Sequence, residues 1–252
     1  ELDERSNQLA QLLWARGLRP GDHIAIFMEN HPRYLEVAWA ALRSGLYLTT
    51  VNSYLTAPEV AYIVEDCEAQ ALITSPKLTD VVVEALSDPI PRLHTRLMVD
   101  KATDGFELFE EAIAAYPAEP LAEEPLGDFM LYSSGTTGKP KGIRRPSTGG
   151  KVENGLGMAH LLGGMFKFTP ESIYLSPAPL YHSAPIGFST AVQSIGGTVV
   201  VMEHFDPAGA LEAIERYRCN RSQFVPTMFV RMLKLPDAER KRYDISSMEL
   251  AI

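Results

Sequence analysis

The chain has 252 residues, of which 46% are hydrophobic, and this is typical of a globular protein of one or two domains with a sizeable core. Lys and Arg number 23 and Asp and Glu number 32, so the formal net charge is −9, which argues against nonspecific binding to DNA or RNA. The most apolar long segment, 155–166, is too short to cross a bilayer and contains His160, so no transmembrane segment is expected.

Helical and strand patterns alternate along the first half of the chain. Leu2, Leu9 and Leu12 lie near helical spacing, and Gly17 follows where a helix end is expected. The expected helices span 1–16, 32–44, 58–66, 79–86 and 107–114. The expected strands, which are short and apolar, span 24–28, 47–51, 71–74, 97–99 and 129–132. Apolar strands separated by helices predict a mainly parallel sheet covered on both faces, and therefore an α/β layered fold.

The same alternation resumes in the second half. The expected helices there span 155–168, 186–195 and 207–218. The expected strands span 173–175, 198–202 and 222–225. Asp206 and Pro207 give the clearest start signal, because Asp can cap a helix and Pro is favoured in its first turn.

The segment after the strand expected at 129–132 is the most informative part of the chain. It reads YSSGTTGKPKG over residues 132–142 and so combines hydroxyl side chains, glycines and lysines. Hydroxyls can donate hydrogen bonds to an anion, glycines let backbone N–H groups turn toward it, and lysines supply positive charge. Since ligands of parallel α/β sheets bind beyond the carboxyl ends of strands, this segment is predicted to bind phosphate.

Two known loops of related composition do not fit this segment. A Walker A loop has Ser or Thr after its Gly-Lys pair and then a helix, but Lys139 is followed by Pro140, and Pro146 would interrupt a helix. A nucleophile elbow, G-x-S-x-G, has Gly two positions before its Ser, but Leu131 lies two positions before Ser133. A polar surface turn is the remaining alternative, since Ser, Thr, Gly and Pro are common in turns.

The acidic chain is locally basic around this segment. Lys139 and Lys141 lie inside it, and Arg144, Arg145 and Lys151 follow shortly after. Such a cluster would attract a polyanion. It is a second indication of an anionic ligand, with a solvated charged loop as the alternative.

The cysteines and the start of the chain bear on its location. Cys67 and Cys219 are far apart and form no metal or redox spacing, so neither is expected to be a nucleophile, and a reducing, cytoplasmic compartment is favoured. The chain opens with the charged run ELDER and without Met, so no signal peptide is expected and the 252 residues are interpreted as a fragment. Peripheral association with a membrane is left open.

Three motifs together resemble one family. The run at 132–142 resembles the signature loop of the adenylate-forming enzymes, which include acyl-CoA synthetases, aryl-CoA ligases, firefly luciferase and nonribosomal peptide synthetase adenylation domains. SPAPLYHSAP at 176–185 and FVPTMF at 224–229 resemble two family segments beside the carboxylate pocket. The resemblance covers nearly the whole chain. It implies two layered α/β subdomains, residues 18–160 and residues 1–17 with 165–252, the second truncated, and no C-terminal domain.

The resemblance implies an acid–thiol ligase that uses ATP, Mg²⁺ and CoA. In such enzymes a carboxylate attacks the α-phosphorus of ATP, pyrophosphate leaves, and a thiol then displaces AMP from the acyl-adenylate. Because the substrate is the nucleophile, catalysis is mainly positioning and charge stabilisation, and no Ser-His-Asp or Cys-His arrangement is needed. The resemblance assigns the β- and γ-phosphates to Ser133, Ser134, Gly135, Thr136, Thr137, Gly138, Lys139 and Lys141. Thr136, Thr137 and Lys141 are the catalytic candidates.

The resemblance also places a substrate pocket, with His182 as a wall or gate beside the acyl group. The pocket candidates are Tyr181, His182, Gly187, Phe224 and Thr227, together with Pro185, Phe188 and Met228. A buried histidine bonded to a carbonyl is the alternative for His182, and plain core packing is the alternative for the apolar residues. Small residues at Ser183, Ala184 and Gly187 leave room for a bulky apolar acid, which favours a fatty acid over acetate.

Several readings of the function stay open. An aryl-CoA ligase or a carrier-protein-loading adenylation domain would share the chemistry, whereas a noncatalytic nucleotide-binding relative would not. The family segments that bind adenine, ribose and magnesium, and the C-terminal lysine, are absent from residues 1–252, so no metal ligand is assigned within them. The fragment alone is therefore expected to be inactive.

Overall fold

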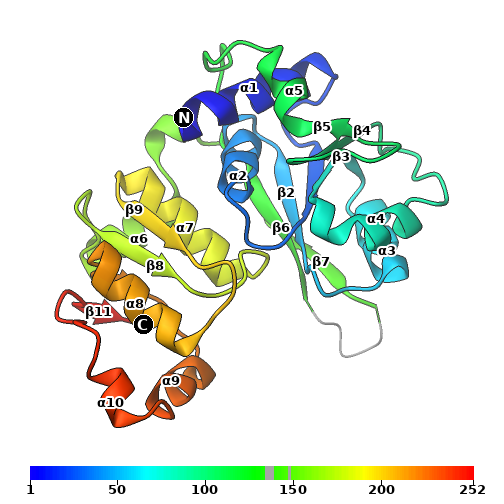
Figure 1. The fold of residues 1–252 in the computed structure, drawn as a ribbon. Coiled ribbons are helices and arrows are strands. Elements are labelled where there is room, and N and C mark those ends of the chain that lie inside the picture. The colour runs from blue at the N-terminus through cyan, green and yellow to red at the C-terminus, as the bar shows by residue number, and fades with distance from the viewer. Residues whose placement is uncertain (134–138, 147–148) are drawn as a thin grey trace. The chain divides into compact units, whose positions relative to one another are not determined.

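The structure is a computed structural model, and it describes residues 1–133, 139–146 and 149–252 (Figure 1). Two compact units make up the chain, Glu1–Asn154 and Gly155–Ile252. Each unit contains a mainly parallel sheet with helices packed on it, which confirms the predicted α/β fold class. None of the described helices is both long and apolar enough to cross a bilayer.

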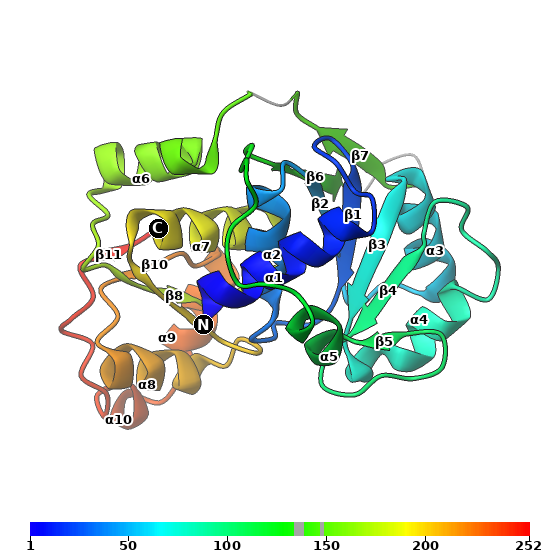
Figure 2. The same cartoon turned by 90° about the horizontal axis from the view of Figure 1, so that it is seen from above.

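The first unit is built on a seven-stranded sheet with the order β5–β4–β3–β1–β2–β6–β7. Its strands are β1 (His23–Phe27), β2 (Tyr47–Val51), β3 (Ala69–Thr74), β4 (Thr95–Met98), β5 (Glu107–Leu108), β6 (Asp128–Ser133) and β7 (Lys141–Arg144). Its helices are α1 (Leu2–Ala15), α2 (Tyr34–Arg43), α3 (Ala57–Asp66), α4 (Thr79–Ala85) and α5 (Phe109–Ala114). Neighbouring strands are parallel except β6 and β7, which are antiparallel. Figure 2 shows α1 and α2 on one face of this sheet and α3 and α4 on the other.

The central strands of the first unit are buried. β1 and β2 are buried along their whole lengths, as the continuous apolar runs in the sequence predict. The core beneath α3 and α4 includes Phe27, Val60 and Leu72. Met130 and Tyr132 of β6 pack against this core, so the strand that leads into the predicted phosphate-binding segment is fixed by hydrophobic contacts.

Helix α3 has a well-defined beginning and end. Thr56 and Glu59 form a capping box in which the Thr56 N–H donates to Glu59 Oε2 at 2.9 Å, and Pro58 lies in the first turn. The helix ends at Asp66, and Cys67 follows as its C-cap. The capping contacts fix where the helix begins and ends, and with it the positions of the side chains in its last turn.

Ion pairs hold α1 to α2 within the first unit. Arg43 Nη2 lies 2.7 Å from Asp3 Oδ1, and Arg5 Nε lies 2.9 Å from Glu36 Oε2. The family resemblance groups residues 1–17 with the second subdomain. That grouping stays a prediction, whereas these ion pairs join α1 to the first unit.

The second unit is built on a four-stranded parallel sheet with the order β11–β10–β8–β9. Its strands are β8 (Ile173–Ser176), β9 (Thr198–Val201), β10 (Arg221–Ser222) and β11 (Leu250–Ala251). Its helices are α6 (Gly157–Phe166), α7 (Ser183–Ile195), α8 (Pro207–Tyr217), α9 (Pro226–Leu233) and α10 (Asp237–Arg240). α6 and α7 share one hydrophobic cluster, and α8 and α9 share another. α8 begins as predicted, because the Asp206 carboxylate accepts from the Gly209 N–H at 2.6 Å.

Several predicted elements are shorter in the structure, and two of them show why. The strand predicted at 222–225 is only the two-residue β10, because Val225 already caps α9 and Pro226 has no N–H for a strand ladder. The helix predicted at 107–114 begins two residues later, because its first two residues pair with β4 as β5. The next element along the chain sets the first boundary, and pairing with a neighbouring strand sets the second.

Candidate functional site

The described ends of the predicted phosphate-binding segment lie in two antiparallel strands, β6 and β7, which are called the β6–β7 hairpin below. β6 continues to Ser133, β7 returns from Lys141, and these two residues are register partners. Because β6 is parallel to β2, Ser133 lies at the carboxyl edge of the sheet, where the sequence predicts the segment to lie. The predicted ligands that lie outside the described residues are Ser134, Gly135, Thr136, Thr137 and Gly138. The prediction of a loop at 141–142 is wrong, because these residues are part of β7.

The two faces of the hairpin have different neighbours. Met130 and Tyr132 face the core beneath α3. A Cβ added to Gly142 would lie 2.3 Å from Met130 Cε and 2.9 Å from Tyr132 Cζ, so Gly142 allows the two strands to pack on that face. Side chains alternate along a strand, so Ser133 and Lys141 project from the opposite face.

The lysines of the hairpin are available to an anion. Lys139 and Lys141 are exposed. Lys141 forms no salt bridge with any carboxylate in the described part of the chain. An unpaired, exposed ammonium can bind phosphate without first breaking an ion pair.

Aromatic and hydrogen-bonding contacts fix the far end of β7. The Tyr47 hydroxyl donates to the Arg145 carbonyl oxygen at 2.8 Å, and the Arg144 guanidinium lies 5.4 Å from the centroid of the Tyr47 ring. The His23 ring stacks on Tyr47 with centroids 4.9 Å apart. These contacts hold the hairpin against β1 and β2.

His23 makes stability depend on pH. Burial, and to a smaller extent the Arg144 guanidinium, lower the pKa of His23 below its usual range. The folded state therefore keeps a neutral ring, whereas the unfolded chain gains a proton as the pH falls through about 6.5. Above that pH we expect the neutral His23 ring to make its full contribution to the free energy of unfolding. As the pH falls below it, this contribution should be lost progressively. Urea unfolding at about pH 5.5 and about pH 7.5 measures this loss, and the change should be smaller in His23→Gln. An equal pH effect in the variant would contradict the assignment.

One predicted pocket segment lies at the start of α7. His182 is the N-cap residue of this helix and is exposed, so the alternative of a buried histidine is wrong. Its ring lies beside that of Tyr181, with centroids 4.3 Å apart. Gly187 lies one turn into α7, and a Cβ added there would meet no atom within 4 Å. The start of α7 therefore presents two rings and an open space.

The other predicted pocket segment lies at the start of α9. Phe224 is buried and packs with Met228 in the cluster that α8 and α9 share, as the core-packing alternative predicts. Thr227, in the first turn of α9, is exposed. The two segments follow β8 and β10, which are parallel neighbours, so both begin at the same edge of the sheet. Their roles in substrate binding stay predictions.

The cysteines are placed as structural residues. Cys67 and Cys219 are both free and buried. Burial raises the pKa of each thiol to about 11. The thiolate is therefore not the form present near neutral pH, and neither residue is suited to nucleophilic catalysis.

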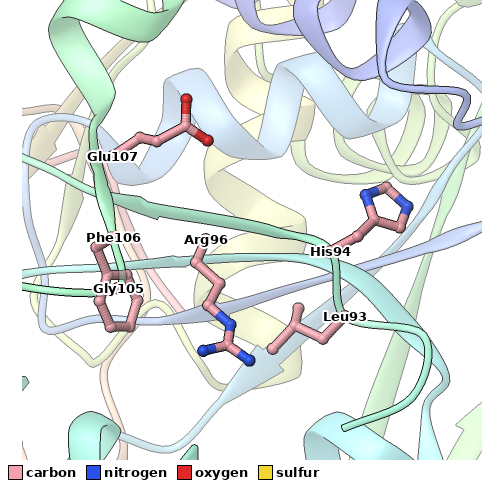
Figure 3. Close-up of a pocket in the computed structure, with 6 residues that line it drawn as sticks. All are labelled: Leu93, His94, Arg96, Gly105, Phe106 and Glu107. Atoms are coloured by element: carbon pink, nitrogen blue, oxygen red, sulfur yellow. The ribbon is translucent and has the colours of Figure 1, made fainter. Parts of the chain in front are cut away.

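A cavity at the β4–β5 edge of the first unit is separate from the predicted site. It is lined by Leu93, His94, Arg96, Gly105, Phe106 and Glu107 (Figure 3). The Glu107 carboxylate and the Arg96 guanidinium point away from each other in Figure 3, and Glu107 is engaged by Arg16 at 2.6 and 2.7 Å. None of the predicted site residues lines this cavity, and its polar groups do not converge on one point.

The fold is that of the N-terminal domains of adenylate-forming enzymes. It superposes on the crystal structure of the anthranilate CoA ligase AuaEII in complex with anthranoyl-AMP with a TM-score of 0.84, covering 99% of this chain and 48% of that one at 21% identity. The model of the AMP-binding enzyme family matches residues 1–252. The chain therefore belongs to the AMP-binding enzyme family.

Relatives of known name include two CoA ligases. A feruloyl-CoA synthase of Amycolatopsis sp is 30% identical over 91% of this chain and 43% of its own length. The medium/long-chain-fatty-acid–CoA ligase FadD8 of Mycobacterium tuberculosis is 28% identical over 99% of this chain and 44% of its own length. The chain spans about half the length of the curated relatives it matches.

Proposed function

We propose that this chain is the N-terminal part of an ATP-dependent acid–thiol ligase, which activates a carboxylic acid as an acyl-adenylate and then forms a CoA thioester. The observation that carries the proposal is the β6–β7 hairpin of an AMP-binding family member, in which Ser133 and Lys141 stand opposite each other at the carboxyl edge of the sheet. The Ser-, Thr- and Gly-rich run lies between them in the sequence.

The chemistry assigned to the hairpin is charge stabilisation. Negative charge builds up on the leaving pyrophosphate, and hydrogen-bond donors and ammonium groups that are already in place lower the barrier. Ser133, Lys139 and Lys141 are the described candidates for this role, and residues 134–138 remain the sequence-predicted ones. The same groups would hold the β- and γ-phosphates before the reaction.

Mg²⁺ belongs to the proposal for the whole protein only. Among the described residues, no group of three or more His, Cys, Asp or Glu is placed to hold a metal ion. We therefore assign no Mg²⁺ ligand to this chain.

Isotope exchange tests this activity. In the whole protein, labelled pyrophosphate should enter ATP only when a suitable carboxylic acid is present, because the adenylation step is reversible. The isolated 252 residues should show no exchange. A whole protein that exchanges at the same rate with and without every acid tried would contradict acid activation.

The acid is proposed to be bulky and largely apolar. The open space at Gly187 supports this size, since no atom would contact a Cβ there. A fatty acid is the first candidate, and the similarity to the fatty-acid–CoA ligase FadD8 supports it. An aromatic acid is the second candidate, and the similarity to a feruloyl-CoA synthase supports that one. A panel of acids of increasing length and aromatic content, compared by kcat/KM, distinguishes the two.

Substitution of Gly187 should change which acids the protein accepts without changing the stability of the fold. Gly187→Leu should not destabilise the fold, because Leu is a better helix former and the position has free space. It should lower kcat/KM for bulky acids by about tenfold or more and leave small acids unaffected, as expected when a side chain fills a pocket. Gly164→Leu in α6 is the matched control, since its Cβ would also meet no atom within 4 Å. Equal losses for small and bulky acids would contradict the assignment.

A further inference from the structure

The last turn of α3 holds the hairpin through a carboxylate. The Tyr132 hydroxyl of β6 donates to Asp66 Oδ2 at 2.5 Å. Burial and this hydrogen bond raise the pKa of Tyr132 above its usual range, so the phenol keeps its proton. A phenol bound to a carboxylate is a charge-assisted hydrogen bond, which is stronger than a neutral one.

Tyr62, one turn earlier in α3, reaches the two residues that precede β7. The Tyr62 hydroxyl donates to the Pro140 carbonyl oxygen at 3.1 Å, and Lys139 Nζ lies 4.8 Å from the centroid of the Tyr62 ring. Tyr62 and Asp66 are four residues apart, so they share one face of the helix, and their side chains lie 3.4 Å apart. The last turns of α3 therefore contact β6 at Tyr132 and the residues immediately before β7 at Lys139 and Pro140. Figure 1 shows α3 on the same side of the first unit as β7.

Helix stability does not explain this arrangement. A carboxylate in the last turn of a helix interacts unfavourably with the carbonyl end of the helix dipole. Asp66 lies at that position, as the last residue of α3, and is exposed. Its contact with Tyr132 thus comes at a local electrostatic cost, and what the contact fixes is the hairpin.

We infer that Tyr62, Asp66 and Tyr132 are positioning residues for triphosphate binding, which hold the strands of the hairpin so that Ser133 and Lys141 stay opposite each other and orient the Lys139 ammonium. The inference rests on the proposed function. It extends the site to residues assigned no phosphate contact, two of which, Tyr62 and Asp66, lie on α3 and far from the motif in sequence.

The test is Asp66→Ala in the whole protein, with affinity for ATP measured by calorimetry and KM for ATP and for the acid measured by kinetics. Removing a carboxylate near a polyanion site would strengthen ATP binding if its charge alone mattered. A positioning role predicts instead that ATP binding weakens. We expect Kd and KM for ATP to rise roughly tenfold, as for the loss of a hydrogen bond to a charged group. KM for the acid should stay within the error of the wild type.

Matched variants separate positioning from general damage. Glu65→Ala removes an exposed carboxylate from the adjacent position of α3 and should leave ATP affinity unchanged. Asp66→Asn keeps an acceptor for Tyr132 and should recover part of the loss. Tyr62→Phe keeps the ring beneath Lys139 and should be milder than Tyr62→Leu.

Two outcomes are distinguishable. If wild-type protein shows acid-dependent exchange and Asp66→Ala binds ATP as tightly as the wild type or more tightly, the positioning role is overturned and the proposed function stands. If wild-type protein shows no exchange with any acid but Asp66→Ala still weakens ATP binding, the proposed function fails and the positioning role stands.

Discussion

Lys141→Ala in the whole protein should lower kcat/KM for ATP by about 10- to 100-fold, the effect of losing a charge-assisted hydrogen bond of about 1.5–3 kcal/mol. The Lys141 side chain projects from the face of the hairpin opposite the core. Its ammonium group forms no salt bridge with a carboxylate among the residues that the structure describes. Because charge develops on pyrophosphate as it leaves, most of the loss should fall on kcat.

The folding of Lys141→Ala should be close to that of the wild type. An exposed lysine without an ion pair contributes little to stability, so the melting temperature should change by no more than that of Lys101→Ala, an exposed lysine elsewhere in the first unit. We would compare Lys141→Ala with Lys101→Ala by steady-state kinetics at varied ATP concentration and by thermal unfolding. Equal kinetics for Lys141→Ala and Lys101→Ala would remove Lys141 from the site.

Gly127→Ala should destabilise the protein, because the added methyl group has no room. A Cβ at this position would lie 2.3 Å from the Leu46 carbonyl oxygen and 2.8 Å from the Ala41 carbonyl oxygen. Both atoms are backbone, so the clash cannot be relieved by a rotamer change, and we expect a loss of about 1–3 kcal/mol or more in the free energy of unfolding. The Gly127 N–H also donates to the Leu42 carbonyl oxygen at 2.7 Å.

The position of Gly127 links this loss to the site. Gly127 immediately precedes β6, so a displaced backbone would shift the strand that carries Ser133. Urea unfolding of the whole protein measures the effect. Gly164→Ala, where the added methyl meets no atom within 4 Å, should be neutral or stabilising. Similar unfolding midpoints for the two variants would contradict the close packing at Gly127.

The sheet was predictable from the sequence because its central strands are buried on both faces. β1 and β2 read as continuous apolar runs, and Gly17 and Pro58 mark helix boundaries. α7 begins three residues earlier than predicted, since Pro185 fits the first turn of a helix and does not end it. Local composition therefore identified the elements better than their boundaries.

The hairpin was recognised by composition, but its geometry was not. β7 reads KGIR, with one apolar residue, so no strand pattern marks it, and it is ordered by pairing with β6. Tyr62 and Asp66 carry no local signal either. They look like ordinary polar positions of an amphipathic helix, and only the fold brings them to Tyr132 and Pro140.

The proposed role of the β6–β7 hairpin is to bind the triphosphate of ATP while an organic acid is activated. A crystal structure of the whole protein with a nonhydrolysable ATP analogue tests it most directly. We expect phosphate oxygens within hydrogen-bonding distance of Ser133 and of Lys141 Nζ. A fully occupied triphosphate bound elsewhere, with both residues still facing solvent, would contradict the claim.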